Sequence, residues 1–189
     1  MNWKITVGGL AAVVLLLLAM SVAQVVWGAV LYAHAIYETI DITIPEAHLT
    51  NVVMKGGQSE VVIDETTELA APVIIQEVGS INCPGGQVVN RTLKVDIPSL
   101  PGPIYVSAIL TFGEASMENV KMEAVYLCSS GGTLNGVNMT VADFPEGMVQ
   151  EIASATMYNL FTKIFYASIG SLGYTDLEIK IVINIPWLQ

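Results

Sequence analysis

The sequence is poor in the residues on which most enzymes and nucleic-acid-binding proteins depend. It has two histidines, His34 and His48, and only seven Lys and Arg residues against seventeen Asp and Glu. It contains no H-E-x-x-H pair, no G-x-S-x-G nucleophile elbow and no Gly-rich phosphate loop with its lysine. Binding to nucleic-acid phosphates needs clustered Lys and Arg, which this chain of net charge −10 lacks. We therefore predict no catalytic, cofactor-binding or metal-binding residues and no nucleic-acid partner.

Cysteine is also scarce, and Cys83 and Cys128 are the two in the chain. Two cysteines in an exported protein are expected to pair, and closing the loop between them would contribute roughly 4 kcal/mol on the chain-entropy model. The alternative is two buried free thiols in a cytosolic protein. A nucleophile built from Cys128 and His48 would also require a free thiol. We predict a Cys83–Cys128 disulfide.

Apolar residues, by contrast, are abundant at the N-terminus. No side chain from Ile5 to Tyr37 is charged, taking His34 as neutral. This run is longer than a membrane helix of about 20 residues or a signal-peptide core of about 7–15. Lys4 precedes it, and Ser21-Val22-Ala23 places small residues where a signal peptidase reads them. We predict a signal peptide over 1–23 and export to the cell surface or beyond.

Two alternatives leave the apolar run uncut. In the first it is a membrane anchor, and the positive charge of Lys4 places the following domain outside the cell. In the second it is a core helix like that of archaeal type IV pilins and archaellins, which also begin with a long apolar run. No convincing prepilin cleavage signal lies near Lys4, so this alternative ranks last.

After the leader the dominant hydrophobic period is two, which is typical of a strand buried on one face. The alternation is clear in Ile40–Ile44, where Pro45 is expected to end the strand, and clearer in Leu177–Ile185. Segments rich in Gly, Pro and Ser separate further candidate strands. These candidates are 60–64, 72–78, 87–97, 104–112, 120–127 and 136–141. The pattern predicts one mainly β domain over 38–189, an antiparallel β-sandwich of the jelly-roll or Ig-like kind.

One segment departs from the period of two. Between Glu146 and Leu172 the apolar residues recur near helical spacing, and no proline interrupts them. Asp143 followed by Pro145 resembles a helix start, and Gly170 is a suitable stop. We therefore predict one amphipathic helix packed against the sheet.

Two N-glycosylation sequons fit an exported protein. They are Asn90-Arg91-Thr92 and Asn138-Met139-Thr140, and both fall within or beside predicted strands. We predict Asn90 and Asn138 as glycan acceptors.

Cleavage after Ala23 would leave the apolar segment 24–37 at the start of the mature chain. Burying each of its large side chains is worth roughly 1.5–3 kcal/mol, so the segment needs a groove. In an extended conformation one face carries Val25, Trp27, Ala29, Leu31 and Ala33. The segment either forms the first strand of its own domain or adds to the sheet edge of a neighbouring copy. The second arrangement is a head-to-tail contact, which propagates into a filament.

In this order of parts the chain resembles the TasA/camelysin-like secreted subunits and the archaeal bundling pili, threads and cannulae built by donor-strand exchange. The matching residues are Ser21-Val22-Ala23 at the cleavage site and Leu31-Tyr32-Ala33-His34-Ala35 leading into Ile40-Asp41-Ile42. The protease label of camelysin is not carried over, because no site supports it. The long apolar run and the cysteine pair have no counterpart in the family pattern.

The resemblance implies a non-enzymatic subunit of an extracellular homopolymer, with the segment from Val25 to Ala33 as the subunit interface. A membrane-anchored extracellular binding module and a pilin-like subunit are the alternatives.

Overall fold

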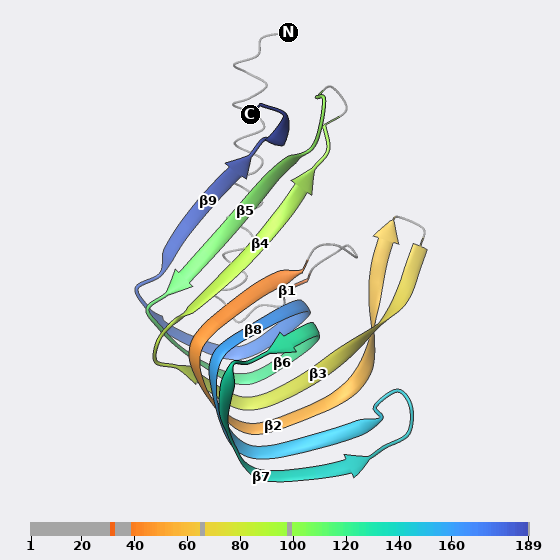
Figure 1. The fold of residues 1–189 in the computed structure, drawn as a ribbon, viewed down its shortest axis with the longest axis vertical. Coiled ribbons are helices and arrows are strands. Elements are labelled where there is room, and N and C mark those ends of the chain that lie inside the picture. The colour runs from red at the N-terminus through yellow and green to blue at the C-terminus, as the bar shows by residue number, and fades with distance from the viewer. Residues whose placement is uncertain (1–30, 33–38, 65–66, 98–99, 189) are drawn as a thin grey trace.

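The computed structural model describes residues 31–32, 39–64, 67–97 and 100–188, which are almost entirely β-strand (Figure 1). The strands are antiparallel, as predicted, and the mainly β class is confirmed. A 3-10 helix, Pro186–Leu188, follows the last strand. The predicted leader, 1–23, lies outside the described residues. The strands are β1 Leu31–Tyr32, β2 Ile40–Asp64, β3 Thr67–Cys83, β4 Gln87–Val95, β5 Ile104–Phe112, β6 Glu114–Cys128, β7 Gly131–Val141, β8 Met148–Thr175 and β9 Glu178–Asn184.

Several strands are longer than the sequence pattern predicts. β5 matches its predicted bounds, whereas β2 continues through Pro45 and through Gly56-Gly57. Proline lacks an N–H, yet it is tolerated here because the position opposite it on β8, Asn159, leaves the regular ladder with a φ of 48°. Pro45 therefore marks an irregularity within a strand and not its end.

The predicted amphipathic helix is wrong, because the segment forms β8 instead. The residues assigned to the apolar face of that helix are largely buried, as expected, and include Ile152, Ala155, Leu160 and Ile164. Bends and register shifts along β8 change which alternate residues face the core, so the spacing of buried residues is uneven and imitates a helical period. Across the described residues, no helix has the length and apolar character needed to cross a membrane.

Four strands are hydrogen-bonded in a cycle. β2 pairs with β3, β3 with β6, and β6 with β8. β8 also pairs with β2, because its residues 149–164 lie beside β2 while its residues 161–175 lie beside β6. The main hydrophobic core lies mostly in this part of the sheet, and Val89 of β4 and Leu110 and Phe112 of β5 also belong to it. Ile40, Ile152, Ile164 and Cys83 are among its most completely buried side chains.

β4, β5 and β9 extend the sheet away from this cycle (Figure 1). β4 joins it through a short pairing of its residues 88–91 with the start of β2, and β5 lies between β4 and β9. Ile104, Val106 and Ala108 of β5 form a second, smaller cluster of buried residues.

A line of bends crosses the curved part of the sheet. In spatial order it consists of Gly136, Ala153, Asn51, Gly79, Asn119 and Gly170. Every second member, beginning with Gly136, has a positive φ, with values of 64°, 51° and 51°. The members between them have little room: a Cβ on Gly79 would lie 3.1 Å from that of Asn51, and one on Gly170 would lie 3.0 Å from that of Asn119. Left-handed residues and small residues therefore alternate from strand to strand.

Candidate functional site

The predicted donor segment is described only at Leu31 and Tyr32. Val25, Trp27, Ala29 and Ala33 lie outside the described residues. Leu31 and Tyr32 form β1, which pairs antiparallel with Ala167 and Tyr166 of β8. The end of the segment thus adds to a sheet edge as a strand, in this case within its own chain.

β1 continues the line of β2 along one edge of β8. β2 occupies this edge up to the Ile40–Ile164 pair, and β1 follows in the same direction. Beyond Ala167, the residues 168–175 of β8 still pair with β6 on the opposite edge. Within the described part of the chain no strand pairs with them on the edge of β1. This stretch of backbone is a candidate acceptor for a strand.

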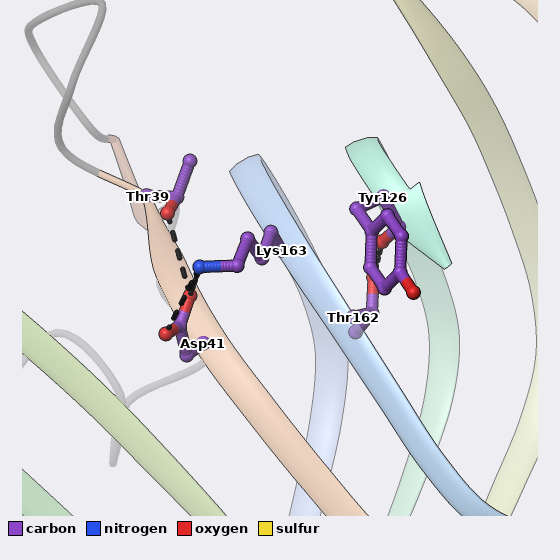
Figure 2. Close-up of polar contacts among 5 residues, drawn as sticks. All are labelled: Thr39, Asp41, Tyr126, Thr162 and Lys163. Carbon is purple, nitrogen blue, oxygen red and sulfur yellow. Dashed lines mark hydrogen bonds and ion pairs between the residues drawn. The ribbon is translucent and has the colours of Figure 1, made fainter. Parts of the chain in front are cut away.

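Side chains of β8 make polar contacts with β2 on one side and with β6 on the other, at Thr162 and Lys163, a few residues before the unpaired stretch (Figure 2). Lys163 Nζ lies 3.4 Å from Asp41 Oδ1 and 3.5 Å from Oδ2, and Thr39 Oγ1 donates to Asp41 Oδ1 at 3.3 Å. On the opposite edge, the buried hydroxyl of Thr162 donates to the Tyr126 carbonyl oxygen at 2.9 Å. The ion pair is partly exposed and contributes about 1 kcal/mol or less, so its role is mainly to fix where β2 begins beside β8.

The ionisable side chains form no larger cluster in the regions that the structure describes. No three His, Cys, Asp or Glu residues there are placed to share a metal ion. His48 Nε2 lies 3.1 Å from Glu46 Oε1, and its Nδ1 lies 3.2 Å from Thr156 Oγ1. His48 and Glu46 are partly exposed and lie two residues apart on the same face of β2, so this contact is an ordinary surface pair.

The predicted Cys83–Cys128 disulfide is not formed. Both thiols are free, with Cys83 buried and Cys128 exposed. Cys83 lies opposite Ala115 near the start of β6, whereas Cys128 is the last residue of that strand. A disulfide needs Cα atoms about 4.4–6.8 Å apart, and the length of β6 separates these two. Burial raises the pKa of the Cys83 thiol from 9.0 to about 11.

The two sequons occupy different environments. Asn138 lies on β7 with its side chain exposed, and its Nδ2 donates to Glu151 Oε2 at 3.2 Å. Asn90 lies on β4 between β2 and β5, where its Oδ1 is buried and has no hydrogen-bond partner in the part of the chain that the structure describes. A glycan on Asn138 would project from an exposed strand, whereas one on Asn90 would have to leave a half-buried position between two strands.

β7 has a second edge with which no described strand pairs, and the sequence prediction missed it. Only 136–141 was predicted as strand, and the preceding glycines as a turn, but β7 begins at Gly131. Every residue of β7 is exposed, including the apolar Leu134, Val137, Met139 and Val141. The strand contains no charged residue, although exposed edges commonly carry Lys or Pro that discourage pairing. The absence of charge was the signal available in the sequence.

No protein-family model, curated protein or solved structure matches the chain. The features of the chain that bear on its function are therefore the strand edges, above all the edge of β8 that pairs with β1.

Proposed function

We propose that the chain is an extracellular structural protein, the subunit of a cell-surface filament assembled by donation of its N-terminal segment. The observation that carries the proposal is the pairing of Leu31 and Tyr32 with the edge of β8. These residues belong to the apolar segment that would begin the mature protein after cleavage at Ala23. Strand addition satisfies backbone hydrogen bonds and buries alternate side chains at the same time.

The edge of β8 supplies a place for such a strand. Between Ser168 and Thr175 the N–H and C=O groups on that edge need partners, and an extended segment of a neighbouring copy would provide them. Each copy would then offer one strand and one edge. Because the two surfaces differ, the contact is head-to-tail and repeats from copy to copy without closing.

The β-sandwich predicted from the sequence is part of this proposal. In it, β4 and β5 would fold over the curved sheet of β2, β3, β6 and β8 as part of a second layer. Val89, Leu110 and Phe112 of these two strands support this arrangement, because they belong to the main core. Exposed strands of an acidic protein then form the outer surface of the filament, where the net charge of −10 favours solubility.

The test is the N-terminus of the protein from its native cell, determined by intact mass and terminal peptide mapping, together with electron microscopy. A first residue of Gln24 and visible filaments are expected. Recombinant protein that begins at Gln24 should assemble, whereas a matched chain that begins at Thr39 should remain monomeric with the same β-sheet circular dichroism.

Two results would contradict the proposal. An intact Met1 in the membrane fraction would favour the membrane-anchored binding module or the pilin-like subunit. Protein that begins at Gln24 and stays monomeric at high concentration would exclude strand donation between copies.

A further inference from the structure

We infer that the edge of β8 binds residues 23–32 as one continuous bent strand in a fixed register, with Gly28 opposite Gly170. The inference rests on the proposed function for the idea that this segment is the ligand of the edge. It adds the register and the residue that determines it. Two independent features of the described residues carry it: the pairing of β1 and the alternation along the line of bends.

The first feature is the register of β1. Leu31 lies opposite Ala167 and Tyr32 opposite Tyr166. Continuing this antiparallel register by one residue at a time places Ala29 opposite Ile169 and Gly28 opposite Gly170. Further along, Val26 comes opposite Leu172.

The second feature is the line of bends, which ends at Gly170 on the edge of β8. Gly170 is one of the members without a positive φ, so the alternation requires a left-handed residue at the next position outward. The same alternation occurs in a second line, where Gly86 and Asp176 have positive φ values of 79° and 49° and Gly113 between them does not.

The residue opposite Gly170 must therefore tolerate a left-handed backbone. Gly, Asn and Asp do so at low cost, whereas β-branched and bulky residues do not. The segment 23–30 contains one such residue, and it is Gly28. The register of β1 and the need for a positive φ opposite Gly170 therefore select the same residue, Gly28. Neither of the two observations was derived from the other.

The bend also decides which donor side chains face the core. Ala167, Ile169 and Leu172 of β8 belong to the core cluster or pack against it, so the inward positions shift by one at Gly170. Directly opposite residues share a face, which turns Leu31, Ala29 and Val26 inward. Trp27 then lies beside Ser171 on the outer face. A regular strand would instead put Val25 and Trp27 on the same face as Leu31.

The first test compares two substitutions of Gly28 in the full mature chain. Gly28→Val should lower the hydrogen-exchange protection of the amides in 168–175 by about tenfold or more, because a β-branched residue resists a positive φ. Gly28→Asn should keep protection near that of the wild type, as Asn51 and Asn119 occupy the equivalent positions on β2 and β6. Equal protection in both variants would overturn the inference.

The second test traps the register with a disulfide in a Cys128→Ser background. Ala29→Cys combined with Ile169→Cys should cross-link on mild oxidation, and the off-register combination of Ala29→Cys with Ser171→Cys should not. No cross-link, or equal cross-linking of the two pairs, would overturn the register.

The size of the cross-linked product separates this inference from the proposed function. A ladder of covalent oligomers would support both. A cross-linked monomer would support the register and contradict donation between copies. A third outcome is that Gly28→Val protein assembles into normal filaments and that the Ala29→Cys, Ile169→Cys pair does not cross-link. This outcome would overturn the register but would not contradict the filament proposal.

Discussion

β6 and β7 follow one another along the same edge of β8, yet one lies in the core and the other is fully exposed. β6 has β3 on its other edge, and its Met117 is 6% exposed. β7 has no strand on its other edge within the described residues, and its Met139 is 58% exposed. Both strands contain apolar residues, so apolar content does not explain the difference. The difference lies in the faces: several residues of β6 turn toward the core, whereas both faces of β7 are exposed.

The sharpest way to test this comparison is to remove the same side chain from each strand. Met117→Ala should lower the free energy of unfolding by about 2–5 kcal/mol, because it leaves a cavity in the core. Met139→Ala should change it by less than about 0.5 kcal/mol. Urea unfolding followed by circular dichroism measures both. Similar losses for the two variants would show that β7 is buried against a partner in solution.

The attachment of β7 to β8 can be broken at one glycine. A Cβ on Gly132 would clash with the Thr156 carbonyl oxygen, whereas one on Gly131 would meet nothing within 4 Å. Gly132→Ala should therefore destabilise the protein by about 1–3 kcal/mol, with the loss of exchange protection concentrated in β7. Gly131→Ala is the matched control and should behave as the wild type. A Gly132→Ala variant with unchanged protection in β7 would refute this close pairing.

The two cysteines extend the comparison to pH. The pKa of the buried Cys83 is raised to about 11, so the folded state favours the neutral thiol. Its contribution to stability is complete below the ordinary pKa of 9.0 and is lost as the pH rises toward 11, with a change of about 2–3 kcal/mol. Cys83→Ala should remove this part of the pH dependence, and Cys128→Ser should not. Thiol labelling of the native protein should modify Cys128 first.

The smallest effect is expected in β3, the strand that covers β6. Gln76 of β3 lies opposite Met122 and is 4% exposed, and its Nε2 has no hydrogen-bond partner among the described residues. Gln76→Met removes a buried donor that is not satisfied, and should raise the unfolding free energy by about 1 kcal/mol. Gln150→Met, at a half-buried position on β8, should have little effect. A destabilised Gln76→Met protein would indicate that the amide has a partner in solution, such as a buried water.

Much of the fold was predictable because alternation is a local property. The period of two identified β5 with its bounds and located parts of β2, β3, β4, β6, β7 and β9. It failed over β8, where bends at Ala153 and Gly170 and the left-handed Asn159 shift the inward side. Alternation predicts a strand correctly only while the strand stays regular, and β8 is interrupted by bends and register shifts.

The candidate site was predictable only in part. The apolar segment that contains Leu31 was predicted from its composition to pair as a strand, and Leu31 and Tyr32 do pair with the edge of β8. Its donation to another copy stays a prediction. The proposed acceptor edge was not identifiable, since residues up to Leu172 were predicted to be the end of a helix. The disulfide failed for a related reason: two cysteines in a sequence give no measure of the length of strand between them.

The sequence by itself determined the mainly β class, the net negative charge and the presence of a long apolar segment near the start of the chain. Composition and alternation are local properties, fixed residue by residue. Only the tertiary structure decided which strand edges are paired and which bends lie side by side. It also decided that Cys83 of β3 lies opposite the start of β6, whereas Cys128 ends that strand. These properties depend on which strands become neighbours. Strands that are distant in the sequence become neighbours only when the whole sheet forms, and a local sequence pattern does not predict which strands will pair.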